Sequence, residues 1–101
     1  MIFVAGTLTV NPALLAEFQQ DVAAMAGRVR QELGCHHYSL LTEDPKTGLV
    51  NVLEQWSDDD ALTTHLKQPW IVEFFNKYVS HLLALNVKVY DISGERALPG
   101  M

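Results

Sequence analysis

The chain has a single cysteine, few basic residues and no long apolar run. Cys35 has no second cysteine to pair with, which excludes an intramolecular disulfide and fits the reducing cytoplasm. The seven lysine and arginine residues are scattered among twelve acidic ones, and the net charge of −5 argues against nucleic-acid binding. No apolar stretch approaches the roughly 20 residues of a membrane span. The β-branched N-terminus predicts a first strand and not a signal peptide.

Apolar residues are nonetheless abundant. They make up 49% of the 101 residues, and only 19% are charged, which is more apolar than is usual for a soluble domain. The length predicts a single domain over residues 1–101, with a polar C-terminal tail at 94–101. A core of this size cannot hide so much apolar surface, so we expect a homo-oligomer.

Apolar periodicity and turn signals predict the element order βαββαβ, an α+β arrangement in which two helices cover one face of a four-stranded sheet. The predicted strands span residues 2–10, 35–43, 49–56 and 85–92. Asn11 and Pro12 are typical of a helix start. The apolar stripe of this helix runs to Leu33, and Gly34 is typical of a helix end. Ser57 matches the first position of a capping box for the second helical region.

The first and third predicted strands are apolar on both faces. Ile2 and Val4 alternate with Phe3 and Ala5, so one apolar set must face away from the helices. A second subunit's sheet is the simplest cover for that set. We therefore predict a sheet-to-sheet homodimer.

Patterns for metal and nucleotide binding are missing. His36 and His37 are adjacent on a strand and point to opposite faces, and no two of the four histidines have a metal-binding spacing. The chain contains no HExxH, paired cysteines, GxGxxG, P-loop or GxSxG. The sequence therefore predicts no metal site and no nucleotide cofactor.

His65 is the clearest candidate for chemistry. Helical spacing places it on the core-facing side, with its ring toward Trp56. The simpler interpretation is a half-buried histidine bound to a backbone carbonyl, and the functional one is a general base in an apolar pocket. Glu54 shares a strand face with Trp56, and a carboxylate on an apolar face needs a partner. A run of aromatic residues in the second helical region is typical of a core, but it also suits a flat aromatic ligand: Trp70, Phe74, Phe75 and Tyr78.

Several segments in order carry a family resemblance. They are Gly34-Cys35-His36-His37-Tyr38, Leu53-Glu54-Gln55-Trp56-Ser57, Ala61-Leu62, His65-Leu66 and Pro69. This pattern resembles the antibiotic biosynthesis monooxygenase family, closest to its quinol monooxygenase-like branch. The resemblance implies a ferredoxin-like, antiparallel sheet that pairs into a dimeric α+β barrel. It also implies oxygenation without metal, flavin or nicotinamide, in which a deprotonated quinol or other hydroxylated aromatic passes an electron to O₂.

The resemblance assigns roles to particular residues. His65 would be the proton acceptor, and Trp56 would line the cavity and donate a hydrogen bond through its indole. The remaining residues of the expected substrate pocket are Tyr38, Glu54, Trp70, Phe74, Phe75, His37 and Asn51. The actinorhodin-pathway member has an asparagine where this chain has Val52, so that relay is not carried over. The pattern of the haem-degrading members is also missing.

Two other functions remain open from the sequence. Relatives of this fold isomerise or degrade small carbonyl compounds, including a signalling molecule, and a dimer that binds a small ligand without turnover would have the same fold. The monooxygenase interpretation further predicts a closed cavity between the sheet and the helices, lined by His65 and Trp56.

Overall fold

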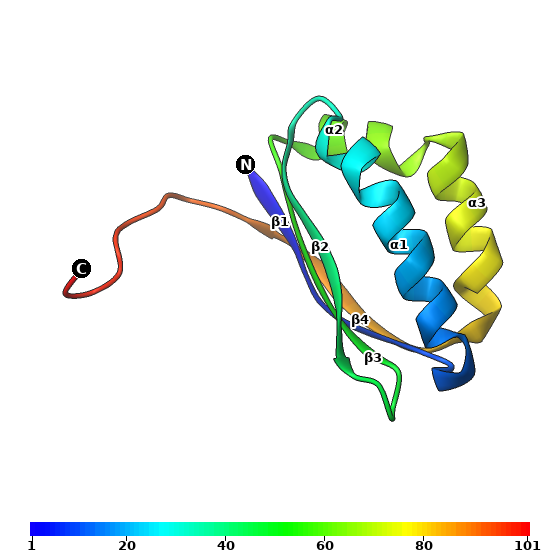
Figure 1. Ribbon diagram of the computed structural model, residues 1–101. Coiled ribbons are helices and arrows are strands. Elements are labelled where there is room, and N and C mark those ends of the chain that lie inside the picture. The colour runs from blue at the N-terminus through cyan, green and yellow to red at the C-terminus, as the bar shows by residue number, and fades with distance from the viewer.

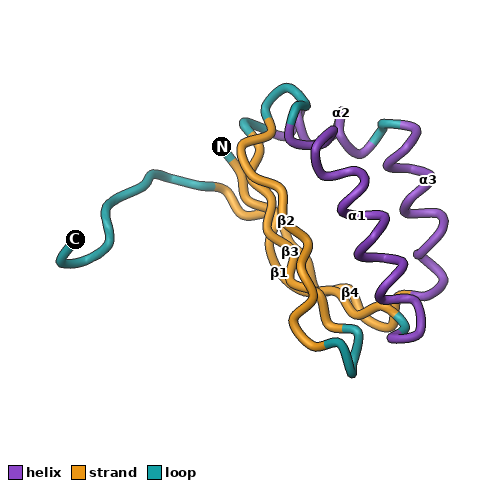
Figure 2. Tube along the Cα trace, viewed as in Figure 1, coloured by secondary structure: helices purple, strands orange, loops and turns teal.

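The computed structural model describes residues 1–101 and has the predicted order of elements (Figure 1). The elements are β1 (Ile2–Val10), η1 (Pro12–Leu14), α1 (Leu15–Arg30), β2 (Cys35–Asp44), β3 (Leu49–Trp56), α2 (Asp59–Leu66), α3 (Pro69–Tyr78), η2 (Val79–His81) and β4 (Leu82–Asp91). The strands form one antiparallel sheet in the order β2-β3-β1-β4. All helices lie on one face of this sheet (Figure 2). The α+β, ferredoxin-like fold is thus confirmed.

The core lies between the sheet and the helices. On β1, Ile2, Val4 and Leu8 are buried against the helical layer, while Phe3 and Ala5 face the other way and are only partly covered. The alternation of strand side chains produces this division. The largest fully buried side chains are Trp56, Phe18, Ile71, Val10, Val29 and Val50.

The end of α1 differs from the prediction. The helix ends at Arg30, and the Leu33 side chain is 94% exposed, so the apolar stripe stops at Val29. The backbone N–H of Gln31 bonds back to the carbonyl of Arg28, and that of Glu32 to the carbonyl of Val29, which closes the last turn. Gly34 has a φ of +85° and turns the chain into β2, so the predicted glycine acts in the loop and not directly at the helix end.

The start of α2 also differs. Asp58 is the cap, and its side chain accepts a hydrogen bond from the Ala61 backbone N–H at 2.8 Å. The hydroxyl of Ser57 instead lies 2.8 Å from Nε2 of His36. Ser57 and Asp58 are both residue types that cap helices well. The Ser57 hydroxyl contacts His36 instead, and Asp58 is the cap.

The last helix and strand are shifted relative to the predictions. In α3 the buried stripe consists of Ile71, Phe74 and Tyr78, whereas Phe75 is half-exposed. β4 begins at Leu82 and not at Leu85, because its pairing with β1 continues past an irregularity to Val10. Beyond β4 the chain has no regular element and extends away from the domain (Figure 1). None of the helices combines the length and the apolar character needed to cross a membrane.

The sheet face opposite the helices is uncovered in the single chain. It carries Leu41, Leu53 and Tyr90, which are 64%, 42% and 52% exposed. These side chains lie on three different strands, β2, β3 and β4. The exposed face accounts for part of the apolar excess in the composition. Its pairing with a second subunit stays a prediction.

Candidate functional site

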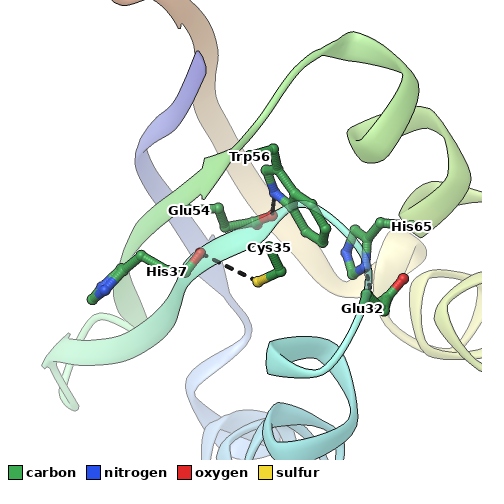
Figure 3. A network of polar contacts seen from close by, with 6 residues as sticks. All are labelled: Glu32, Cys35, His37, Glu54, Trp56 and His65. Carbon is green, nitrogen blue, oxygen red and sulfur yellow. Dashed lines mark hydrogen bonds and ion pairs between the residues drawn. The ribbon is translucent and has the colours of Figure 1, made fainter. Parts of the chain in front are cut away.

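Three elements bring aromatic and acidic side chains together at one end of the core (Figure 3). Tyr38 comes from β2, Glu54 and Trp56 from β3, and His65 from α2. The His65 ring lies 4.6 Å from the Trp56 ring and 5.8 Å from the Tyr38 ring, measured between centroids. His65 is 2% exposed, and Trp56 is fully buried. The predicted approach of His65 to Trp56 is confirmed.

Local structure explains this placement. Strand alternation puts Glu54 and Trp56 on the helix-facing side of β3, next to Ile2 and Val4 across the β1 pairing. The helix α2 has one fully buried side chain, that of His65, and the rest of its surface is in contact with solvent or partly covered. The imidazole is therefore the group that α2 directs into the core.

Glu54 has the partner that its position demands. The indole N–H of Trp56 donates a hydrogen bond to Oε1 of Glu54 at 3.0 Å. Burial raises the pKa of the Glu54 carboxyl, and the hydrogen bond from Trp56 and the nearby His65 ring offset part of that rise. The site thus contains a carboxyl group whose protonated form is favoured relative to an exposed glutamate.

The partner of His65 is a carboxylate and not a backbone carbonyl. Its Nδ1 lies 2.8 Å from Oε2 of Glu32, in the loop between α1 and β2. Gly34 holds this loop against α2, since its carbonyl accepts a hydrogen bond from the Ser57 N–H at 2.8 Å. A β carbon at Gly34 would lie 2.6 Å from that of Ala61, so the loop approaches α2 closely.

Sequence reasoning missed Glu32. An acidic residue just after a helix ordinarily faces solvent, and no spacing rule connects positions 32 and 65. The one available signal is the glycine at position 34, because glycine readily adopts the positive φ of a tight turn, and the structure shows that this turn brings the loop onto α2. Its carbonyl hydrogen bond to Ser57 completes that contact.

Tyr38 and Cys35 are held in their protonated forms. Burial raises the pKa of the Tyr38 phenol, and the charges of Glu54 and Glu32 raise it further. Burial likewise raises the pKa of the Cys35 thiol, whose sulfur lies 3.8 Å from the His37 carbonyl oxygen. Tyr38 can therefore donate a hydrogen bond, whereas Cys35 has no activated thiolate for nucleophilic chemistry.

Two residues of the expected pocket lie elsewhere. His37 and Asn51 are exposed, on strand positions that face away from the helices. The Asn51 amide donates to Oε2 of Glu43 at 2.6 Å. The alternation of β2 and β3 explains this, because Tyr38 and Val52, the next residues along, point inward. His37 and Asn51 therefore lie outside the candidate site.

The aromatic residues of α3 form contacts of their own. The Arg28 guanidinium lies 4.8 Å from the Trp70 ring centroid, and Phe74 packs on Phe18 with 5.3 Å between ring centroids. Phe75 is 47% exposed. None of the Trp70, Phe74 and Phe75 rings makes a ring contact with Trp56 or His65. These residues pack between helices or lie at the surface, and they are not part of this cluster.

The four main depressions of the surface do not include the expected closed cavity. None of the four main depressions is lined by His65 or Trp56. An apolar groove of about 410 Å³ does lie between α1 and β2, and Tyr38 forms part of its wall. Its other lining residues are Gln19, Val22, Ala23, Ala26, Arg30, Ser39, Leu40 and Leu41. No group of three or more histidine, cysteine, aspartate or glutamate side chains gathers as metal ligands.

Known proteins share both the sequence pattern and the fold. A crystal structure of a proposed antibiotic biosynthesis monooxygenase from Caulobacter crescentus has a TM-score of 0.80 and 27% identity, covering 92% of this chain and 90% of that one. Another, from Deinococcus radiodurans, has a TM-score of 0.83 and 24% identity, covering 97% and 98%. Uncharacterized protein sll1783 of Synechocystis sp. is 29% identical over 98 residues, 96% of this chain and 67% of that protein. The family model "Antibiotic biosynthesis monooxygenase" matches residues 1–77, and the chain belongs to this family.

Proposed function

We propose that the protein is a cofactor-independent monooxygenase that oxidises a quinol or another hydroxylated aromatic with O₂, and that His65 accepts the substrate's proton. One observation carries the proposal: a buried imidazole lies near the rings of both Trp56 and Tyr38, and its Nδ1 contacts a carboxylate oxygen. An imidazole held by a carboxylate is suited to general base catalysis. Family membership supports the oxygenase class.

The reaction needs a proton acceptor because the substrate itself supplies the electrons. Removing the proton of a quinol hydroxyl makes the ring electron-rich enough to reduce O₂. One oxygen atom then enters the ring and the other leaves as water, together with the two hydrogen atoms that the quinol gives up. The apolar, water-poor surroundings of His65 would strengthen the electrostatic interactions that favour the deprotonated substrate.

The groove between α1 and β2 is the proposed approach for the substrate. Its volume of about 410 Å³ and its apolar walls suit an aromatic ring. Tyr38 lines this groove and also contacts His65, so it separates the groove from the imidazole. In the proposed complex, the Tyr38 side chain moves aside or donates a hydrogen bond to the substrate.

We also propose that the protein works as a homodimer in the cytoplasm. The exposed Leu41, Leu53 and Tyr90 side chains support pairing of two sheets through their uncovered faces. Sedimentation equilibrium should give a mass near twice 11.3 kDa, and Leu53→Asp should reduce it to that of one chain. A wild-type protein that sediments as a single chain would contradict the dimer.

The direct test is quinol-dependent O₂ uptake by purified protein, corrected for uncatalysed autoxidation. His65→Ala should lower the rate by at least about a hundredfold, in line with loss of a general base. His81→Ala is the matched control, because His81 is exposed in η2 and should leave the rate unchanged. An unchanged rate in His65→Ala would remove His65 from the mechanism.

The same experiment separates the other two functions. An isomerase or a carbonyl-degrading enzyme would turn over its substrate without O₂. A non-catalytic binding protein would show saturable binding of an aromatic ligand, for example by quenching of tryptophan fluorescence, with no O₂ uptake above background. Either result would overturn the proposed function.

A further inference from the structure

We propose that Glu32 is the positioning residue of this site: it holds the His65 imidazole as the Nδ1–H tautomer, so that Nε2 carries the free lone pair that takes the substrate's proton. The assignment of Nε2 as the catalytic base rests on the proposed function. The tautomer and its dependence on Glu32 do not, because they can be observed without turnover.

The geometry selects one tautomer. A neutral imidazole has one N–H and one acceptor nitrogen. Nδ1 lies 2.8 Å from Oε2 of Glu32, and an ionised carboxylate only accepts hydrogen bonds, so the ring proton belongs on Nδ1. Nε2 then has a free lone pair, and it makes no hydrogen bond within the chain.

No other group around the imidazole could take over this role. Glu54 on β3 is the second nearby carboxyl, but its Oε1 accepts the Trp56 indole N–H, and burial favours its protonated form. Tyr38 on β2 meets His65 edge-on through its ring. Cys35, at the start of β2, points its sulfur at the His37 carbonyl. Glu32 is therefore the only hydrogen-bond partner of the ring.

The way Glu32 is held argues against a purely structural role. Its side chain is 11% exposed, and Oε1 is the one buried side-chain polar atom in the protein without a hydrogen-bond partner. Leaving a buried acceptor unpaired costs stability. A residue selected for folding alone would be expected to satisfy both oxygens. The arrangement instead satisfies only the oxygen that faces His65.

The first readout is the ¹⁵N chemical shift of the His65 ring nitrogens, recorded at a pH where the ring is neutral. The wild type should show a protonated Nδ1 and an unprotonated Nε2. Glu32→Leu, which fills the space but offers no acceptor, should shift the ring away from the Nδ1–H form. Glu32→Gln keeps one acceptor oxygen and should retain part of that form. Glu73→Leu removes an exposed carboxylate on α3 and should leave the His65 shifts unchanged.

The second readout is kinetic. Glu32→Leu should lower kcat for quinol-dependent O₂ uptake by about ten- to a hundredfold with little change in KM, and Glu32→Gln should restore part of the rate. Glu32→Leu leaves the Nδ1–H of His65 buried without an acceptor and should lower Tm, whereas Glu32→Gln keeps an acceptor oxygen and should lower Tm less. A merely structural role would change kcat and KM together and would leave the Nδ1–H form of His65 unchanged.

The outcomes separate this proposal from the proposed function. A protonated Nε2 in the wild type, or an Nδ1–H form that persists in Glu32→Leu, overturns the positioning role whatever the activity. A tautomer that depends on Glu32 in a wild-type protein without O₂ uptake supports the positioning of His65 and overturns the monooxygenase function.

Discussion

The indole of Trp56 donates a hydrogen bond to the carboxyl of Glu54, two residues earlier on the same face of β3, at 3.0 Å. Both side chains are buried beside His65. Alternating strand geometry places both side chains on the same face of β3. Because both are buried, the indole N–H and the carboxyl each need a hydrogen-bond partner, and they bond to one another. This pair secures the wall on which the His65 ring packs.

Glu54→Gln should stabilise the protein at neutral pH. The glutamine oxygen still accepts from Trp56, and the variant no longer buries a carboxylate. Burial raises the pKa of Glu54 in the folded state, so the folded protein binds this proton more tightly than the unfolded chain does. Wild-type stability therefore falls as pH rises from the ordinary carboxyl range through the folded-state pKa. The advantage of the variant should vanish in acid.

Urea unfolding at several pH values checks this prediction. Glu54→Leu is the matched control, because it leaves the Trp56 N–H buried without an acceptor and should be about 1–3 kcal/mol less stable than Glu54→Gln. A Glu54→Gln variant that is less stable than the wild type at neutral pH would show that the charge is retained for stability.

Gly34→Ala should destabilise the protein by about 1–3 kcal/mol. Gly34 has a φ of +85°, and its added methyl group would lie 2.6 Å from the Ala61 side chain. The loop that presents Glu32 to His65 must then move away from α2. Thermal unfolding measures the loss. Gly27→Ala, in the last turn of α1 with no atom near the added methyl, should instead gain about 0.5–1 kcal/mol.

Asp21→Asn should weaken the contact between α1 and α3. Oδ2 of Asp21 accepts from the Lys77 ammonium at 2.7 Å and from the Tyr78 hydroxyl at 2.5 Å. The hydrogen bond from Lys77, with that from Tyr78, holds the pKa of Asp21 below its usual range. The stability that the ionised Asp21 contributes is fully present above the pKa of Asp21 in the unfolded chain. It is lost as the pH falls through the pKa of Asp21 in the folded protein.

The expected loss at neutral pH is on the order of 1 kcal/mol, since the pair is partly exposed. Urea denaturation should show the difference from the wild type shrinking to nothing in strong acid. Equal stability at neutral pH would mean that packing of Phe18 against Phe74 and Tyr78 joins the helices without help from Asp21.

Ala23→Phe should raise KM for a quinol several-fold. Ala23 is an exposed residue that lines the groove between α1 and β2, so a phenyl ring there would fill the proposed approach to Tyr38. Ala24→Phe adds the same ring on the α3 side of α1 and should leave KM unchanged. Equal KM values for the two variants and the wild type would place substrate binding elsewhere.

The element order, the one-sided helical layer and the meeting of His65 with Trp56 could all be predicted from the sequence. These features depend on local periodicity, which specifies which side chains face inward. The cap of α2 could not be predicted, because Ser57 and Asp58 are both good caps. The choice between them depends on the contact of Ser57 with His36, which is distant in sequence.

Two parts of the candidate site needed the structure. Glu32 reaches His65 through a loop whose course depends on close packing at Gly34, a tertiary contact without a sequence period. The aromatic residues of α3 were grouped with the site by residue type alone. Helical phase instead turns Phe74 into the contact between α1 and α3 and leaves Phe75 at the surface.

The most direct measurement of the central claim is the fate of labelled oxygen. The purified protein, treated with a chelator and free of flavin and nicotinamide, would receive a quinol and ¹⁸O₂, and the rapidly quenched product would be analysed by mass spectrometry. The account predicts one labelled oxygen atom in the product of the wild type and of His81→Ala, and none above background in His65→Ala. A product that forms without O₂, or labelling that persists in His65→Ala, would contradict it.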